Sequence, residues 1–449
     1  MRPDIPFGAQ HILQTLAGAG HEAYLVGGCV RDLLRGIPPH DWDICTSALP
    51  EQTQACFAGQ RLVETGLKHG TVTVLADGGS YEVTTYRTEG PYSDGRRPDH
   101  VRFVPNLAVD LARRDFTMNA IAMGLDGALH DPFGGAQDIR HGTIRCVGRP
   151  DLRFQEDGLR IMRALRFSAV TGHHIEEQTA RAIHDHRSML GRVAAERIGA
   201  ELRRLLVGPN VGDVLRQYPD VFYQFWPQLG PLAGLEQHGP WHCWDGWEHT
   251  VRTVEAAPAD PVLRLTMLLH DVGKPLCKST DEDGIDHFYG HPAVSAQLAD
   301  EMLRALRSDN RTREQVVCLV GRHDMPLPPQ DRTIRRWLGR LGQERFFQLL
   351  AVKRADSMGR APETAEEQLA ELAEIQRMAE EIVAQGQCLT LKDLAVDGRD
   401  AIAAGIPAGP EVGRALEALL ERVLDGDIPN HRETLLELIG SNHDKRHDV

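Results

Sequence analysis

Long apolar runs are missing from this chain of 449 residues. No stretch reaches the roughly 18 uninterrupted apolar residues of a membrane-spanning helix. The N-terminus, MRPDIPFGAQHILQTLAG, also lacks the basic-then-apolar order of a signal peptide. These absences argue against a membrane as a partner and predict a cytoplasmic protein.

Closely spaced cysteines and excess positive charge are missing too. The eight cysteines are scattered, with no C-x-x-C pair, which argues against a zinc ribbon or a disulfide framework and predicts a reducing compartment. The net charge of −14 argues only weakly against nucleic-acid binding, because the local field matters more than the sum. Arginine is concentrated between Arg140 and Arg204, so the sequence is compatible with a basic groove on an acidic protein.

The pattern of apolar residues predicts an α+β protein with two to four domains. Residues 1–138 alternate helical stretches with short β-rich runs, and the predicted strands are AYLVG, WDICTS, RLVETG, TVTVLAD and YEVTTYRTE. From about residue 151 the strand signals vanish, and the chain is predicted to be helical to about residue 440. The last residues, SNHDKRHDV, are expected to form a frayed end.

The first chemical motif is AYLVGGCVRDLLRGIPPHDWDICTS, residues 23–47. A strand, a glycine turn at Gly27-Gly28 and a helix carrying Arg31 can cradle a phosphate. In the strand that follows, Asp41 and Asp43 are predicted to share one face, where their charges repel. A divalent cation would offset that repulsion and serve phosphoryl chemistry. The alternative interpretation is a solvated acidic turn.

The second motif is DLARRDFTMNAIAM, residues 110–123. Arg113 and Arg114 can meet phosphate oxygens through two parallel hydrogen bonds, and Asp115 or Asn119 can contact a ribose. The alternative is a charged helix start in which Asp115 is the cap.

The third motif is RFQEDGLRIMRALRFSA, residues 153–169. Spacings of three along one predicted helix place a carboxylate and three guanidinium groups in one polar stripe: Asp157, Arg160, Arg163 and Arg166. Cytosine and adenine each present an exocyclic amine donor beside a ring-nitrogen acceptor, which a carboxylate and an arginine match. Guanine and uracil present the reverse order. Asp157 and Arg160 are therefore predicted to select C and A without a template; the alternative is a salt-bridged helix face.

Together these stretches resemble the bacterial class II CCA-adding tRNA nucleotidyltransferases of the poly(A) polymerase/tRNA nucleotidyltransferase family. The signatures are LVGGCVRD with DWD, RRDFTMNA, DPFGG, EDGLR and AAERI, and the resemblance covers nearly the whole chain. It implies a polymerase-beta-like head followed by all-helical parts. The expected division is a head at 1–138, a neck with the base-reading helix at 139–206, a body at 207–375, a tail at 376–440 and a frayed C-terminus at 441–449.

The resemblance implies template-independent addition of C, C and A to tRNA from CTP and ATP, with release of pyrophosphate. It implies Mg²⁺ bound by Asp41 and Asp43, and nucleotide binding by Gly28, Arg31, Arg114, Asp157, Arg160, Arg163 and Arg166. It also implies that DPFGG, residues 131–135, is a hinge. Glu82 is either a third carboxylate of the site or a structural glutamate. The long loop from Glu89 to His100 favours full CCA addition over a partial, CC- or A-adding activity. A bacterial poly(A) polymerase, which shares the head, is the other alternative.

A second group of motifs lies further along: WEHT, LLHDVGKP, FYGHP, GRHD and KRADS. Their order resembles the HD-domain phosphohydrolases and implies such a domain at about 244–360. By that resemblance His249, His270, Asp271 and Asp356 form a four-ligand metal core, and His291 and His323 add ligands for a second metal. Imidazole with carboxylate suits Mn, Fe, Co or Ni. Lys274, in HDVGKP, can pair with a substrate phosphate.

Two classes of function therefore compete. One is an RNA nucleotidyltransferase that also carries a metal-dependent phosphohydrolase. The other is chiefly a metal phosphohydrolase whose head serves as a nucleotide- or RNA-binding module. The intact D-W-D triplet favours the first, because a head retained only for binding would be free to lose one carboxylate. The sequence leaves the oligomeric state open.

Overall fold

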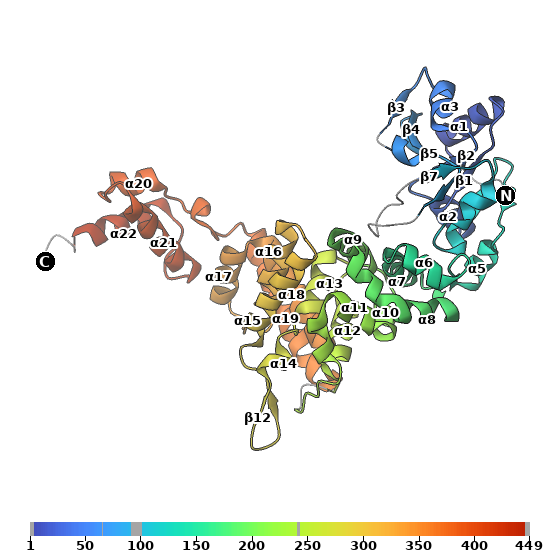
Figure 1. Ribbon diagram of the computed structural model, residues 1–449. Coiled ribbons are helices and arrows are strands. Elements are labelled where there is room, and N and C mark those ends of the chain that lie inside the picture. The colour runs from blue at the N-terminus through green and yellow to red at the C-terminus, as the bar shows by residue number, and fades with distance from the viewer. Residues whose placement is uncertain (1–3, 65, 91–100, 240–242, 445–449) are drawn as a thin grey trace. The chain divides into compact units, whose positions relative to one another are not determined.

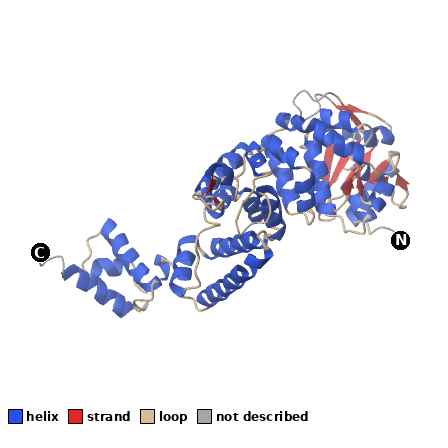
Figure 2. Ribbon diagram, turned by 90° about the horizontal axis from the view of Figure 1, so that it is seen from below, coloured by secondary structure: helices blue, strands red, loops and turns tan. Residues whose placement is uncertain are grey.

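The computed structural model describes residues 4–64, 66–90, 101–239 and 243–444. The predicted α+β class is confirmed: Figure 2 shows the strands gathered in the N-terminal part of the chain, with helices through most of the rest. The chain forms two compact units, residues 1–230 with 305–307 and residues 231–304 with 308–449. Residues 91–100, most of the loop predicted to govern full CCA addition, lie outside the described part of the chain. The finer division into head, neck, body and tail stays a prediction.

A seven-stranded sheet is the centre of the N-terminal part (Figure 1). Its spatial order is β3-β4-β5-β2-β1-β8-β9. The strands are β1 (Ala23–Val26), β2 (Asp43–Thr46), β3 (Arg61–Val63), β4 (Thr71–Ala76), β5 (Gly79–Thr85), β8 (Ala122–Met123) and β9 (Leu129–His130). Each predicted strand is present, except that YEVTTYRTE is divided: β5 ends at Thr85, and β6 (Arg87–Glu89) pairs with β7 (Val101–Phe103) in a separate sheet. All neighbours pair antiparallel except β2 and β5, which are parallel.

Side chains along β5 alternate between the two faces of the sheet, and this alternation determines which face Glu82 occupies. Tyr81, Val83 and Thr85 are buried, so the intervening side chains point to the opposite face of the sheet. Glu82 is therefore exposed there. The elements around the sheet are α1 (Phe7–Gly18), α2 (Gly28–Leu34), α3 (Pro50–Cys56), η1 (Leu67–His69), β6 (Arg87–Glu89), β7 (Val101–Phe103), α4 (Leu107–Ala112), η2 (Thr117–Asn119) and α5 (Gly135–His141).

The helical remainder of the first unit begins after α5. Its elements are β10 (Thr143–Ile144), α6 (Pro150–Glu156), α7 (Leu159–Thr171), β11 (His174–Ile175), α8 (Glu177–His186), η3 (Arg187–Arg192), α9 (Ala195–Leu206), α10 (Val211–Gln217) and α11 (Pro219–Phe225), and η4 (Pro227–Leu232) runs into the second unit. The expectation of purely helical structure beyond residue 151 is wrong in two places. β11 pairs in parallel with β10, and β12 (Ser279–Thr280) forms an antiparallel hairpin with β13 (Asp286–His287). Ladders of two residues are too short to leave a period-2 signal in the sequence.

The second unit is otherwise helical. Its helices are α12 (Gly246–Ala256), α13 (Pro261–Leu269), α14 (Lys274–Cys277), α15 (His291–Ala305), α16 (Asn310–Val320), α17 (Asp331–Leu341), α18 (Gln343–Met358), α19 (Pro362–Ala384), η5 (Leu391–Asp393), α20 (Gly398–Ala403), α21 (Pro410–Leu424) and α22 (Arg432–Asp444). One hydrophobic core joins α17, α18 and α19, and a second joins α20, α21 and α22. α22 extends to Asp444, into the segment expected to be frayed. Within the described ranges, no helix has the length and apolar character needed to cross a membrane.

Candidate active sites

Three carboxylates meet on one face of the head sheet. Asp43 is the first residue of β2, and its register partner on the parallel strand β5 is Glu82. Asp41 precedes the strand rather than lying in it, and it is exposed. The structure thus brings the predicted pair together with the third carboxylate that the sequence left open.

The charges around Asp43 compete. Burial raises the pKa of Asp43, Glu82 raises it further, Arg114 lowers it, and Asp41 raises it again. Concentrated negative charge of this kind is the ordinary setting for an oxygen-binding divalent cation. The donors present, all carboxylate oxygens, therefore fit Mg²⁺.

The glycine turn lies directly beside this cluster. Gly27, at the start of α2, has a φ of +79°, a backbone conformation that favours glycine. A Cβ atom at Gly27 would stand 3.1 Å from Nη1 of Arg114 and 3.9 Å from Oδ2 of Asp43. The turn, the guanidinium and the carboxylate therefore surround one point. The glycine turn predicted at Gly27-Gly28 is therefore present, and Gly27 is its residue nearest to Arg114 and Asp43.

Arg31 is held by neighbours on two sides. Its Nε and Nη2 each donate to Asp32 at 3.0 Å, and its Nη1 donates to Oδ1 of Asn119 at 2.9 Å. Asn119 in turn donates to Asp115 at 3.1 Å. The motif predicted to touch a ribose therefore links Arg31 to Asp115 in this structure.

The predicted single helix with four polar residues in one stripe is wrong. α6 ends at Glu156 and α7 begins at Leu159, so Asp157 lies between the two helices. Its Oδ1 accepts a hydrogen bond from the backbone N–H of Leu159 at 3.0 Å, which competes with continued helix. Only Arg160, Arg163 and Arg166 share α7.

Asp157 and Arg160 each have a partner of opposite charge. Nη2 of Arg197, from α9, lies 2.9 Å from Oδ2 of Asp157. Nη1 of Arg160, which is 7% exposed, lies 2.7 Å from Oε2 of Glu156. The sequence motif EDGLR contains Glu156, and its spacing of four from Arg160 was the available signal for this pair.

The other two arginines of α7 gather around Phe167. Arg163 binds Asp115, with Nη2 2.5 Å from Oδ2. Burial raises the pKa of Asp115, but Arg163 and the Asn119 hydrogen bond outweigh it and leave the pKa at about 2. The guanidinium groups of Arg31, Arg163 and Arg166 lie 5.1, 5.5 and 4.2 Å from the centre of the Phe167 ring. The glycine turn and α7, the helix predicted to read the base, are thereby joined through one aromatic side chain.

In the second unit, all of the predicted HD-type ligands converge although they come from distant segments. His249 lies in α12, and His270 and Asp271 directly follow α13. The Nε2 atoms of His249 and His270 are 3.2 Å apart, and they lie 3.3 and 3.2 Å from Oδ2 of Asp271. Oδ1 of Asp356, from α18, lies 3.1 Å from Nε2 of His249.

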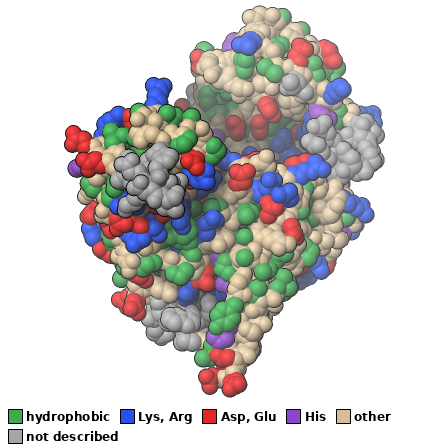
Figure 3. All heavy atoms as spheres, turned by 90° about the vertical axis from the view of Figure 1, so that its left-hand side faces the viewer, with side chains coloured by type: hydrophobic (Ala, Val, Ile, Leu, Met, Phe, Trp, Pro, Cys, Tyr) green, Lys and Arg blue, Asp and Glu red, His purple; other side chains and the backbone are tan. Residues whose placement is uncertain are grey.

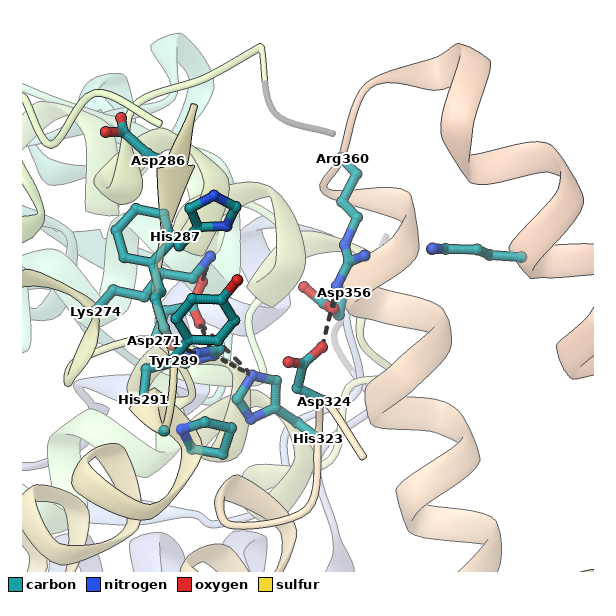
Figure 4. Close-up of a pocket in the computed structure, with 14 residues that line it drawn as sticks. Asp271, Lys274, Asp286, His287, Tyr289, His291, His323, Asp324, Asp356 and Arg360 are labelled. Carbon is teal, nitrogen blue, oxygen red and sulfur yellow. Dashed lines mark hydrogen bonds and ion pairs between the residues drawn. The ribbon is translucent and has the colours of Figure 1, made fainter. Parts of the chain in front are cut away.

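Asp271 also serves the second pair of histidines, which Figure 4 shows beside it. The Nε2 atoms of His291 and His323 are 3.1 Å apart, and they lie 3.3 and 3.6 Å from Oδ1 of Asp271. One carboxylate therefore stands between two histidine pairs, with one oxygen toward each. Each histidine pair, together with Asp271, is grouped closely enough to hold a metal ion.

The hydrogen bonds of the four rings fix their tautomers. Each Nδ1 lies at hydrogen-bond distance from a backbone carbonyl, which can only accept: Gly359 for His249 at 3.1 Å, Met267 for His270 at 2.7 Å, Phe288 for His291 at 2.8 Å and Val320 for His323 at 2.7 Å. When such a ring is neutral, the proton on Nδ1 leaves a lone pair on Nε2 that can bind a metal. This orientation of the second ring nitrogen is typical of metal-binding histidines.

Two facing Nε2 atoms repel one another unless a proton or a metal cation lies between them. Two atoms that each bind one ion at about 2.1 Å stand roughly 3 Å apart, which matches the Nε2–Nε2 separations. Burial raises the pKa of Asp271, but His270 and Lys274 lower it well below the usual range, so the carboxylate is ionised. The donor set fits two divalent transition metals.

Two basic side chains complete this site. Nζ of Lys274, noted in the sequence, lies 2.7 Å from Oδ2 of Asp271. Nη2 of Arg360, which the sequence analysis missed, lies 2.5 Å from Oδ2 of Asp356. Both line a cavity of about 400 Å³ that opens at the metal ligands (Figure 4). The spacing of four between Asp356 and Arg360 on one helix was the available signal.

Comparison with known proteins identifies the family. Residues 23–145 match a family model described as the poly A polymerase head domain, residues 172–218 one described as "Probable RNA and SrmB-binding site of polymerase A", and residues 285–439 one described as tRNA nucleotidyltransferase domain 2. A CCA-adding enzyme of Levilactobacillus brevis is 35% identical over 435 residues, which are 95% of this chain and 96% of that protein. The chain belongs to the CCA-adding enzyme family.

Two further relatives agree. The CCA-adding enzyme of Lactobacillus helveticus is 51% identical over 208 residues, which are 46% of this chain and 52% of that protein. The crystal structure of the Bacillus stearothermophilus CCA-adding enzyme in complex with CTP superposes with a TM-score of 0.73, at 33% identity over 98% of both chains. The chain is thus a nucleotidyltransferase, and its family implies a divalent metal.

Proposed function

We propose that this chain adds C, C and A to the 3′ end of tRNA from CTP and ATP. The observation that carries the proposal is the convergence of Asp43, Glu82 and Arg114 on the turn at Gly27. Relatives named for CCA addition span the chain from end to end, and the Bacillus stearothermophilus relative was solved with CTP.

In the proposed reaction, the tRNA 3′-hydroxyl oxygen attacks the α-phosphorus of the nucleotide. A new P–O bond forms as the hydroxyl gives up its proton to solvent, the bond from that phosphorus to the oxygen bridging the α- and β-phosphates breaks, and pyrophosphate leaves with the electron pair. Asp41, Asp43 and Glu82 would hold Mg²⁺. Two such ions would stabilise the charge on the attacking and leaving oxygens. Arg114, Arg31 and the turn at Gly28 position the triphosphate.

The base would be read by Asp157 and Arg160. The Asp157 carboxylate accepts from the exocyclic amine of cytosine or adenine, and the Arg160 guanidinium donates to the neighbouring ring nitrogen. The ion pairs of these side chains with Arg197 and Glu156 hold them in place. Arg163 and Arg166 would support the nucleotide from α7. Guanine and uracil would set their carbonyl oxygen against the Asp157 carboxylate and their ring N–H against the Arg160 guanidinium, and are refused.

The experiment is extension of a tRNA transcript that lacks its last three nucleotides, with labelled CTP or ATP and Mg²⁺. We expect CC with CTP alone and CCA with both nucleotides. No extension of this substrate would overturn the proposal, and unlimited addition of A from ATP would favour a poly(A) polymerase.

A second activity is supported by the histidine cluster. The Nε2 atoms of four histidines lie within 3.6 Å of an Asp271 oxygen, and with Asp356 beside them they form a donor set suited to Mn, Fe, Co or Ni. We propose a metal-dependent phosphohydrolase at this site. Metals bound there would lower the pKa of water and so supply a nucleophile at neutral pH.

In the hydrolysis, water oxygen bonds to phosphorus, the ester P–O bond breaks, and the leaving alkoxide takes a proton. Lys274 and Arg360 are placed to bind the phosphate oxygens. Phosphate or cyclic phosphate at a damaged tRNA 3′ end is a reasonable substrate, because its removal restores the hydroxyl that the head extends. The assay is hydrolysis of a 2′,3′-cyclic nucleotide with Mn²⁺, Co²⁺ or Ni²⁺, together with the metal content of the purified protein. No bound metal and no hydrolysis would overturn this assignment.

A further inference from the structure

One exposed aromatic side chain stands at the rim of the histidine site. Tyr289 is 78% exposed, yet it lines the same cavity as Asp271, Lys274 and His323. It lies between β13 and the metal ligand that begins α15, His291. Figure 4 shows the Tyr289 ring on the side of the cavity opposite the helix that carries Asp356. The Tyr289 ring is therefore accessible to a ligand that enters the cavity.

The Tyr289 ring is part of a stack. The rings of His287 and Tyr289 are almost parallel, with 9° between their planes and 5.2 Å between their centres. Nε2 of His287 lies 2.7 Å from Oδ2 of Asp281, which orients the imidazole. Asp281 itself accepts hydrogen bonds from the backbone of Asp283 and Ile285. The turn of the hairpin therefore holds the imidazole on which Tyr289 rests.

The base of the hairpin is also anchored. Asp286 accepts from the backbone N–H of His238 at 2.8 Å and from Thr280 at 2.7 Å, and Nζ of Lys278 lies 2.9 Å from it. Because these contacts order the hairpin in advance, a ligand that stacks on Tyr289 does not have to immobilise it.

The charged side chains around the cavity restrict which ligands can bind beside Tyr289. Lys274 and Arg360 are the basic groups of the cavity wall, which places a phosphate near the metal ligands. The tip of the hairpin carries Asp281, Glu282 and Asp283, and Figure 3 shows acidic side chains there, with a histidine and hydrophobic side chains further along the hairpin. An acidic tip repels a long duplex lying along the hairpin, but not a single nucleotide or a chain end.

We infer that the Tyr289 ring, which stacks on the ring of His287, also stacks on the nucleobase next to the phosphate that is hydrolysed. This inference rests on the proposed phosphohydrolase. The substrate class is then a nucleotide or a single-stranded RNA 3′ end bearing phosphate, not a small phosphate ester. The cavity of about 400 Å³ falls in the range of roughly 300–1,000 Å³ that is usual for small-molecule sites. Stacking on an aromatic ring tolerates any base.

The test compares substrates with and without a base. Adenosine 3′-phosphate is paired with glycerol 2-phosphate, and adenosine 2′,3′-cyclic phosphate with the cyclic phosphate of propane-1,2-diol. We expect Tyr289→Ala to lower kcat/KM for the adenosine compounds roughly tenfold, mainly through KM, and to leave the base-free esters within about twofold. Tyr289→Phe keeps the ring and should behave as wild type. Leu276→Ala is the matched control, because Leu276 is 73% exposed and does not line the cavity.

Binding provides a readout that is independent of turnover. Titration calorimetry of adenosine 3′-phosphate into full-length chelator-treated protein, with CTP in excess to occupy the head, should show weaker binding to Tyr289→Ala than to Tyr289→Phe. Equal losses for substrates with and without a base, or equal affinities in the titration, would overturn the stacking role and leave the hydrolase in place. If wild-type protein hydrolyses none of the compounds, the hydrolase assignment is wrong, and the titration alone decides whether Tyr289 binds a base.

Discussion

Asp43 and Glu82 are direct register partners on the parallel strands β2 and β5. Asp43 is the first residue of β2, and Glu82 lies within β5. Asp43 also lies beside the turn at Gly27. Two carboxylates at one level of a sheet repel each other, and this repulsion contributes to the raised pKa of Asp43. A divalent cation bound by both carboxylates would offset that cost, which is why we propose this pair as the centre of the head site.

Replacing either predicted metal ligand in the head should abolish nucleotide addition. We expect Asp41→Ala and Asp43→Ala each to lower single-turnover addition roughly 100-fold or more, because the charge on the reacting oxygens loses its stabilisation. Binding of tRNA, measured by filter retention, should change little. Near wild-type addition by either variant would show that the assignment is wrong.

Whether Glu82 is a metal ligand can be tested separately from Asp41 and Asp43. Glu82→Gln keeps the size of the side chain and removes the charge beside Asp43. If Glu82 is a third ligand, addition should fall and recover partly at higher Mg²⁺ concentration. A wild-type Mg²⁺ dependence would make Glu82 a structural residue only.

Arg160→Ala should relax base selection. Half of the donor–acceptor pair that matches C and A is lost, so the preference for CTP and ATP over GTP and UTP should fall by about 10-fold or more in single-turnover incorporation. Arg149→Ala is the control, since the Arg149 side chain is 75% exposed. Unchanged selectivity in Arg160→Ala would place base reading elsewhere.

The ion pair between Asp115 and Arg163 should make the first unit sensitive to acid. The folded pKa of Asp115, about 2, lies below the ordinary value near 3.9, so its stabilisation is present above about pH 4 and is lost as the pH falls toward 2. Asp115→Asn should therefore cost about 2 kcal/mol at pH 7, and its difference from wild type should shrink below about pH 4. Urea unfolding of both proteins from pH 7 to pH 3 measures this. The exposed Asp185 provides the control variant Asp185→Asn, and a cost for Asp115→Asn that stays constant down to pH 3 would contradict the ion-pair account.

Removal of the metal ligands from the second unit should separate the two activities. His270→Ala with Asp271→Ala should lose bound transition metal, measured by elemental analysis, and hydrolysis of cyclic nucleotide. Addition of CCA should remain within about twofold, because the head ligands belong to another compact unit. His431→Ala, at an exposed histidine of the same unit, should retain both metal and hydrolysis. Retention of metal by the double variant would show that the ion is bound elsewhere.

Full CCA addition is expected rather than a partial activity. The loop of residues 89–100 is long, and residues 91–100 lie outside the described part of the chain. Sequencing of the products should show CCA ends when both nucleotides are supplied. Products that stop at CC with ample ATP would show a CC-adding enzyme.

The sequence by itself determined the order of the motifs, the strands of the head and the residue types available for chemistry. These are local properties: alternation predicts β5, and a glycine turn is visible between a strand and a helix. A hydrogen bond from the Leu159 backbone to Asp157 is local as well, yet the helical spacing concealed the break that it stabilises.

Tertiary structure alone decided the rest, because the deciding contacts join residues far apart in the chain. The sheet register sets Glu82 against Asp43. Helix packing sets Asp356 against His249, more than a hundred residues away, and turns the two oxygens of Asp271 toward different histidine pairs. No local pattern encodes which oxygen faces which ring. That arrangement follows from burying the hydrophobic faces of several helices at once, which fixes the ligands relative to one another only after the chain has folded.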